Sequence, residues 1–112
     1  MSFSAITMVQ ATDAPSSVAA QYTQASNTKG VVRHAVFTNH TAGAVTLSVY
    51  VVESGGTATA ARLVLDTYSI AAHTAYTSPE LSGVVLNAGD SIQTVASAAT
   101  SIGQNISGVL QT

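Results

Sequence analysis

Hydrophobic and polar residues alternate over much of the chain after residue 30, and the clearest alternation runs over Ala44–Glu53. Four hydrophobic residues of this segment fall on one face: Val45, Leu47, Val49 and Val51. A period of two is the spacing of a β-strand, and one hydrophobic face beside one polar face is typical of an antiparallel sheet. We therefore predict a half-buried strand over Ala44–Glu53.

A second alternating segment, Val31–Asn39, predicts the preceding strand. Strict alternation divides it into two faces, Val32, His34, Val36 and Thr38 on one and Val31, Arg33, Ala35 and Phe37 on the other. A strand-like stretch also begins at Tyr22, and Ala58–Asp66 fits a strand or a helical turn. The remaining strand-like segments are Tyr68–Tyr76, Val84–Leu86, Ser91–Ser97 and Ser101–Leu110.

These seven or eight short strands recur at a spacing of about 8–14 residues, with turn residues between them. This spacing is typical of an all-β sandwich or barrel. We predict an antiparallel β-sandwich with a jelly-roll-like order. A domain of 112 residues can bury a core without metal or disulfide. The predicted core consists of Val36, Val45, Leu47, Val49, Val51, Leu63, Leu65, Ile70, Leu86, Ile92 and Ile106.

Residues 1–21 show the weakest pattern, so we predict an N-terminal arm or extended segment there and place the sandwich domain over residues 22–112. The first residues lack the positive charge and continuous hydrophobic stretch of a signal peptide. No window of about 20 apolar residues predicts a transmembrane span. The sequence therefore predicts no membrane partner.

Two turns stand out by composition. Gly55 and Gly56 lie in the strongest turn signal of the chain, Ser54–Thr57. In the second turn, Gly89 supplies a residue that adopts positive φ without strain, and Asp90 can accept hydrogen bonds from nearby backbone amides. Since no second carboxylate lies near Asp90 in the sequence, we predict a structural turn here and not a metal site.

The chain is poor in charge: it has three Lys or Arg residues, five Asp or Glu residues and a net charge of −2. Charged side chains normally protect exposed strand edges and keep monomers soluble. We therefore expect other subunits to cover much of the surface. Three basic residues are too few to neutralise a run of phosphates, which argues against a nucleic-acid partner.

No motif of the sequence predicts catalysis or a cofactor. The chain lacks cysteine, a Gly-x-Ser-x-Gly elbow and a phosphate-binding loop with its lysine. Its three histidines, His34, His40 and His73, do not have the spacing of a zinc site. Coordination by one histidine from each subunit around a trimer axis is the alternative. We predict no catalytic residue, no metal and no cofactor.

Tyrosine is the residue type that best fits a contact surface. Tyr50 lies on the less hydrophobic face of the strongest strand, and Tyr68 and Tyr76 flank a later one. Together with Arg33 they are our candidate interface residues, because a tyrosine ring offers area with a polar tip. Tyrosines gathered in one exposed concavity would instead favour sugar binding.

Several turn and strand motifs together resemble a known group of proteins. They are Phe37-Thr38-Asn39 with Thr41, the valine-rich Val45–Val52, Ser54-Gly55-Gly56, Leu86–Asp90 and Ile106-Ser107-Gly108. Over about Tyr22 to Leu110 the chain resembles small β-sandwich proteins encoded among the structural genes of tailed bacteriophages. The step Leu86–Asp90 is also similar to a turn in jelly-roll domains of the tumour-necrosis-factor and complement type, which trimerise.

The phage resemblance implies a non-enzymatic part of the virion, made in the cytoplasm of the host bacterium. A capsid decoration (cement) protein is the first expectation within that class, followed by a neck, tail or fibre component. The implied partners are capsid or tail subunits and further copies of the chain, with a trimer as one expected arrangement. A lectin-like receptor-binding module is the alternative function, and a secreted β-domain of cellular origin is disfavoured by the lack of a signal peptide.

Overall fold

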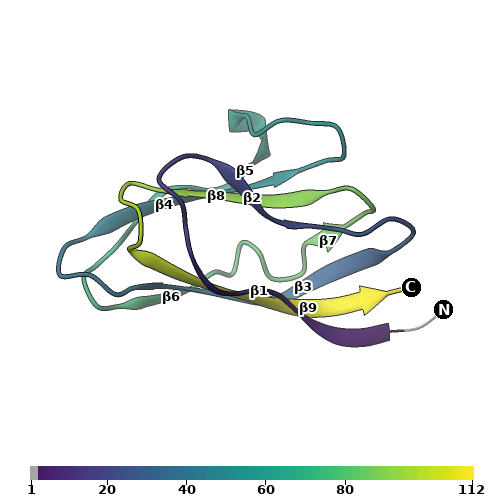
Figure 1. Cartoon of the computed structure of the whole chain (residues 1–112), viewed down its shortest axis with the longest axis horizontal. Helices are drawn as coiled ribbons and strands as arrows, with labels where there is room; N and C mark the ends of the chain where they lie inside the picture. The colour runs from purple at the N-terminus through teal and green to yellow at the C-terminus, as the bar shows by residue number, and fades with distance from the viewer. Residues whose placement is uncertain (1–2) are drawn as a thin grey trace.

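The computed structural model describes residues 3–112, which form two antiparallel sheets packed face to face (Figure 1). In chain order the elements are β1 (Phe3–Asp13), β2 (Ala19–Thr23), β3 (Lys29–Asn39), β4 (Val45–Val52), the 3-10 turn η1 (Ala60–Arg62), β5 (Leu63–Ile70), β6 (Ala75–Thr77), β7 (Val85–Leu86), β8 (Ser91–Ala96) and β9 (Ile102–Gln111). Within residues 3–112, no helix has the length and hydrophobicity needed to cross a membrane.

The strand order is that of a jelly roll. Sheet A has the order β1-β9-β3-β6, with the short β7 also paired to β3, and sheet B has the order β2-β8-β4-β5. The pairs β1 with β9, β2 with β8, β3 with β6 and β4 with β5 are nested, as in one long hairpin rolled into two layers. The predicted all-β, jelly-roll-like sandwich is confirmed.

The segment expected to be an arm, residues 1–21, lies within the sandwich from residue 3 onward. Strand β1 pairs along β9 from Phe3, opposite Gln111, to Asp13, opposite Gly103, and β2 includes residue 21, so the expected division falls inside a strand. Two register shifts interrupt β1, and they bury the consecutive residues Met8 and Val9. Such bulges disturb the two-residue period, which explains the weak sequence pattern.

A bulge in β3 also corrects the predicted division of that strand into two faces. The register with β9 shifts between Val32 and His34. Before the shift Val32 faces the core, whereas after it the buried residues are Ala35, Phe37 and Asn39. The face predicted to unite Val32, His34, Val36 and Thr38 is therefore wrong, because one extra residue reverses the alternation.

Eight of the eleven predicted core residues are buried: Val45, Leu47, Val49, Leu65, Ile70, Leu86, Ile92 and Ile106. Val51 is partly buried against the same core. The predictions for Val36 and Leu63 are wrong. Val36 follows the β3 bulge and lies half-buried on the outer face, and Leu63 pairs with Tyr50 on the outer face of sheet B. Phe37 and Ile102 are among the buried residues that the predicted core lacks.

Asn39, fully buried at the end of β3, holds the β3–β4 connection in place. Its side-chain amide donates to the backbone carbonyls of Gly43 (2.8 Å) and Ile70 (2.9 Å). Its side-chain oxygen accepts from the backbone N–H (2.9 Å) and the hydroxyl (2.6 Å) of Thr41. One side chain therefore ties the connection to the end of β5, in the other sheet.

Candidate assembly surface

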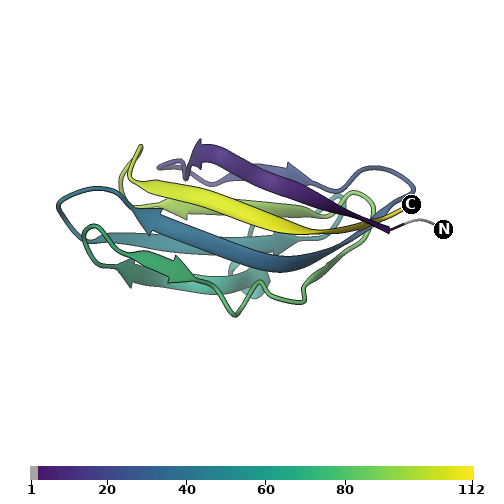
Figure 2. The same cartoon turned by 90° about the horizontal axis from the view of Figure 1, so that it is seen from below.

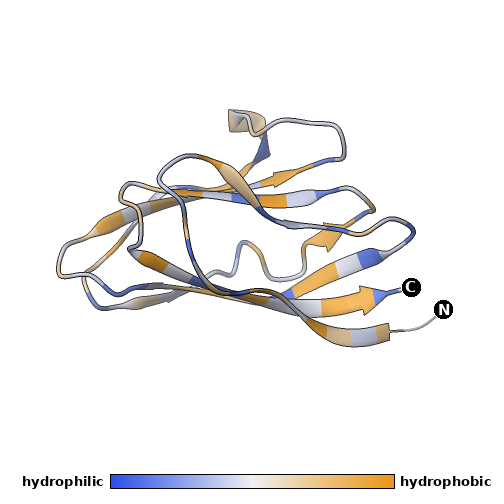
Figure 3. Cartoon of the chain, viewed as in Figure 1, coloured by the Kyte–Doolittle hydropathy of each residue, from blue (hydrophilic) through white to orange (hydrophobic). Residues whose placement is uncertain are grey.

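The outer face of sheet A carries a continuous row of apolar residues near the chain termini. Ala5 pairs with Val109, Val109 with Val31, and Val31 with Val85, so the row crosses β1, β9, β3 and β7. Directly opposite residues in a sheet point to the same side. Figure 3 shows hydrophobic residues gathered at this end of sheet A. We call Ala5, Val109, Val31 and Val85 the apolar row.

Polar residues border the apolar row on one side, and on the other side the neighbouring row consists of Phe3, Gln111 and Lys29. The next row towards the middle of the sheet consists of Thr7, Ser107 and His34. On the opposite side Phe3 is 63% exposed, and at the end of the row Val85 is 54% exposed. An apolar strip between polar borders is a chemically suitable surface for burial against another protein.

Arg33, predicted from the sequence as an interface residue, lies at the bulge in β3 beside this row. It helps to line a shallow hollow on the same face of sheet A. The other lining residues are Ala5, Ile6, Thr7, Ser107, Gly108 and Val109. The structure therefore places Arg33 on one side of the apolar row and Lys29 on the other, where either can contact a polar or acidic group of a partner.

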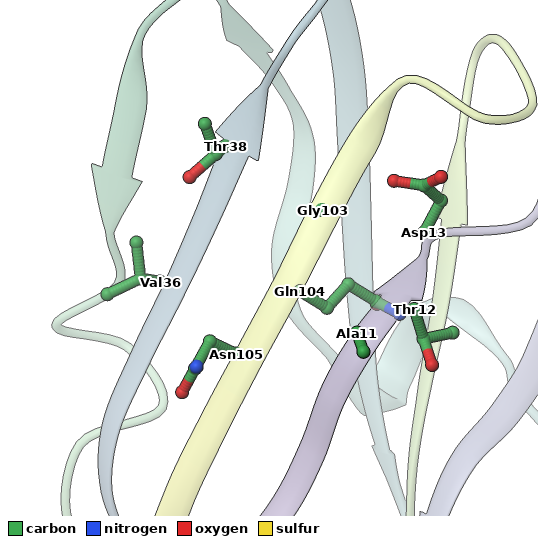
Figure 4. A pocket seen from close by; sticks show the side chains of 8 residues that line it. All are labelled: Ala11, Thr12, Asp13, Val36, Thr38, Gly103, Gln104 and Asn105. Atoms are coloured by element: carbon green, nitrogen blue, oxygen red, sulfur yellow. The ribbon is translucent and has the colours of Figure 1, made fainter.

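A second hollow lies at the other end of sheet A, at the position of Gly103 in β9, which has no side chain to fill it (Figure 4). Asp13 on β1 and Thr38 on β3 flank this position, because both pair with Gly103. The Asp13 carboxylate lies 2.9 Å from Nε2 of His40, which joins the end of β1 to the β3–β4 connection. Residues 3–112 contain no group of three or more His, Cys, Asp or Glu side chains placed to hold a metal ion.

The three histidines lie in separate places. His34 is exposed on the outer face of sheet A, His40 contacts Asp13, and His73 occupies a turn with φ of 53°. Coordination of a metal by one histidine from each subunit stays an untested alternative to our prediction of no metal site.

Tyr68 and Tyr76, two of the candidate interface tyrosines, stack on each other at one side of the sandwich. Their ring centroids are 4.2 Å apart and their planes differ by 25°. Tyr68 pairs with the buried Leu47 in sheet B, and Tyr76 with the buried Phe37 in sheet A. Both rings thus reach into the space between the edge strands β5 and β6 and close this side of the core.

Tyr50 lies apart from this stacked pair, on the outer face of sheet B. Its cross-strand neighbours are Leu63 on β5 and Gln93 on β8. The three tyrosines therefore do not gather in one concavity. Tyr68, which is 41% exposed, and Tyr50 each offer only part of a ring surface to a partner.

Glu80 fixes the position of the Tyr76 hydroxyl, which donates a hydrogen bond of 2.6 Å to the carboxylate. Burial, and then this hydrogen bond, raise the pKa of Tyr76 to about 12. The same hydrogen bond holds the pKa of Glu80 below its usual value. The pair closes the sandwich only while Tyr76 keeps its proton.

We expect the ionisation of Tyr76 to make the fold sensitive to alkali. Its folded pKa lies above the unfolded value of about 10, so the stability it contributes is complete below pH 10 and is lost as the pH rises through about 12. Ultraviolet titration of tyrosinate should show a component near pH 12 that Tyr76→Phe removes. Burial raises the pKa of Tyr22 as well, so Tyr22→Phe is the control and should leave the component near pH 12 in place. A component near pH 12 that survives Tyr76→Phe would contradict the assignment.

The residues predicted to form structural turns meet at the end of the sandwich where β4 and β8 pair. Gly55 and Gly89 have φ of 80° and 87°, and the N–H of Gly56 donates to the carbonyl of Glu53 (2.9 Å). Asp90 accepts hydrogen bonds from the backbone N–H groups of Asn87 (2.9 Å) and Ser54 (3.1 Å). Asp90 therefore joins the two turns, a link that the sequence motifs, treated one by one, do not indicate.

Intramolecular pairing reduces the small charge of the surface still further. Arg62 donates to both carboxylate oxygens of Glu53 and holds the pKa of Glu53 at about 2. With Asp13 near His40, Asp90 engaged by backbone amides, Glu80 by the Tyr76 hydroxyl and Asp66 by the Thr67 hydroxyl, all five carboxylates contact groups of the same chain. Little charge is left on the surface to oppose contact with another protein.

Comparison with known proteins shows a similarity in fold alone. The chain matches no protein-family model and no curated protein sequence. It is similar to a chain in the structure of infectious bursal disease virus, Gx strain, with a TM-score of 0.51 and 17% sequence identity. The similarity covers 97% of this chain and 31% of the viral chain, so this chain spans about a third of that length. The β-sandwich is thus shared with part of a viral chain.

Proposed function

We propose that the chain is a structural protein of a virion, a subunit that acts by binding other subunits and not by catalysis. The apolar row on sheet A is the observation that carries this proposal, because the exposed Val85 and Ala5 and the half-buried Val31 and Val109 gain further free energy only when another surface covers them. Two further observations support it: the chain has only eight charged side chains, and its fold is similar to that of a chain from a virus structure.

Within this class we propose a capsid decoration protein of a tailed phage, on the strength of the sequence motifs from Phe37 to Gly108. Such a protein stabilises a shell by linkage, since a molecule that binds only the assembled state shifts the equilibrium towards that state. The apolar row would contact capsid subunits, and Arg33 beside it would orient the contact. A neck, tail or fibre component would bind through the same kind of surface. It would differ from a decoration protein in its copy number and in its place in the virion.

Labelled antibodies against the chain, viewed by electron microscopy on particles of the phage that encodes it, test the proposal. We expect label over the whole capsid. Label confined to the neck or tail would overturn the decoration role and keep the virion role. Absence of the chain from purified particles would overturn both.

A charge placed in the apolar row should prevent incorporation into particles. Val85→Lys changes an exposed side chain, so we expect the fold to persist while the amount of protein on purified particles falls at least tenfold. Ala75→Lys is the matched control, because Ala75 is exposed on the opposite edge of sheet A, outside the row. Equal incorporation of both variants, measured by quantitative mass spectrometry of particles, would count against the row as the contact surface.

A sugar-binding module is the alternative function, and Tyr50 is the residue that would serve it. Tyr68 and Tyr76 stack on each other, so one face of each ring is covered and less aromatic surface is left for stacking on a sugar. A glycan array with the wild-type chain and Tyr50→Ala decides this alternative: binding that depends on Tyr50 would favour it over assembly.

A further inference from the structure

Among the strands at the four edges of the sandwich, as described over residues 3–112, only β1 is long and carries no charge before its last residue. On the other side of sheet A the edge strand β6 has three residues and β7 two. In sheet B the edge strand β2 has five residues. The longer β5 contains the exposed Asp66 and, in its middle, a residue with positive φ, Thr67 (φ 49°). The corresponding residue of β1, Ala11 (φ 54°), lies near the end of that strand and outside Phe3–Thr7. Short length, charge and irregular backbone are the usual protection of an edge against pairing.

Strand β1 has eleven residues, and its first charged side chain is Asp13 at the far end. Proline is absent from the strand as well. Figure 2 shows β1 along the margin of sheet A, with β9 on its inner side. Its first register shift comes after Thr7, so Phe3–Thr7 is a straight segment of five residues in continuous register with β9. Ala5 is the middle residue of this segment.

We propose that Phe3–Thr7 pairs antiparallel with the same segment of a second copy, around a two-fold axis at Ala5. Pairing of a strand with its own copy requires that no like charges meet, and the uncharged Phe3–Thr7 meets this requirement. Pairing about Ala5 uses the whole straight segment and places Phe3 opposite Thr7 of the second copy. This inference rests on the proposed function and names one partner of the assembly surface.

The proposed dimer doubles the apolar row. A two-fold axis perpendicular to sheet A keeps the outer faces of both copies on the same side. The apolar row of one copy, which ends at Ala5, then continues into the row of the other. The result is one apolar strip from Val85 of one copy to Val85 of the second, centred on the axis, with the backbone groups of both β1 edges paired.

Opposite charges at position 5 give a direct test. Ala5→Lys and Ala5→Glu each place like charges opposite each other in the dimer, where Cβ atoms lie roughly 5 Å apart. By light scattering after size exclusion, we expect a dimer for the wild type and a monomer for each variant alone. An equimolar mixture of the two variants should restore the dimer. Ala75→Lys, on the opposite edge of the same sheet, should stay dimeric.

A single cysteine gives a second readout, which also traps a short-lived dimer. The chain contains no cysteine, so Ala5→Cys joined by a short bifunctional maleimide can form only a product between two copies. We expect efficient cross-linking for Ala5→Cys and little for Ala75→Cys. A wild-type monomer at high concentration, a trimer insensitive to Ala5→Lys, or equal cross-linking of both cysteine variants would overturn the β1 pairing. Detection of the chain on virions is a separate measurement, so the proposed function can stand if this pairing fails.

Discussion

Replacing Gly108 by alanine is expected to lower the free energy of unfolding by about 3 kcal/mol, within the range seen for overpacked cores. Gly108 is buried in β9, and a Cβ atom there would collide with the backbone carbonyl oxygen of Val31 on the neighbouring strand. The same atom would lie 2.9 Å from the Met8 methyl group. A methyl group of a flexible side chain can move aside, but the β3 backbone cannot move without losing its register with β9.

Gly103→Ala in the same strand is the matched control. A Cβ atom at Gly103 meets its nearest neighbours at 3.9 Å, an ordinary contact distance. Alanine also loses less conformational freedom on folding than glycine, so this variant should unfold at an equal or slightly higher denaturant concentration. Urea denaturation followed by circular dichroism compares the two. Equal stability of both variants would show that β3 and β9 separate more easily than the structure indicates.

Asn39→Asp is expected to cost about 4 kcal/mol at neutral pH, although the side chain keeps its size. The change removes both hydrogen bonds donated to the carbonyls of Gly43 and Ile70 and turns two lone pairs of a buried carboxylate towards them. The Gly43 carbonyl keeps the Thr41 hydroxyl as a donor (3.1 Å), so most of the cost arises at the buried Ile70 carbonyl and at the carboxylate itself. A buried group that loses its hydrogen bond costs about 1–3 kcal/mol, and the buried charge adds to this cost. Thermal unfolding at pH 7 measures the loss.

The pH dependence of this variant separates charge from lost packing. The oxygens around position 39 favour the protonated acid, so the folded pKa of the new carboxyl group lies above the unfolded value of about 4. Relative to the wild type, stability should therefore recover as the pH falls through the folded pKa, in part, since the acid donates one hydrogen bond where the amide donates two. Asn105→Asp, on the exposed side of β9, should change little at any pH. A deficit independent of pH would contradict this account.

The strands that keep a strict two-residue period could be predicted from the sequence, and those with bulges could not. Strand β4 alternates buried and half-buried residues from Val45 to Tyr50, so its face was predicted correctly. In β3 the sequence holds no sign that Arg33 is an extra residue, because Val31–Asn39 reads equally well as unbroken alternation. Strand β1 contains two register shifts, so the sequence shows no two-residue period of hydrophobic residues along it.

The candidate surface depends on pairing between distant parts of the chain, which a pattern of neighbouring residues does not contain. Val31 and Val109 look like ordinary strand valines until the register of β3 with β9 places them opposite each other. Tyr68 and Tyr76 show the reverse case. Sequence reasoning assigned both rings to a contact surface, but the structure stacks them at the edge of the core, because each pairs with an inward-facing residue. Their role as interface residues stays a prediction.

The nested strand order also bears on when the subunit becomes able to associate. The hairpin of β4 and β5 closes a short loop, whereas β1 meets β9 only when opposite ends of the chain come together. Loop-closure entropy grows with the length of chain enclosed, and contacts between distant residues form late. We expect β1 to dock last during folding. The uncharged edge at Phe3–Thr7 is then displayed as a strand only by chains whose sandwich is otherwise complete, which keeps half-folded chains from pairing with one another.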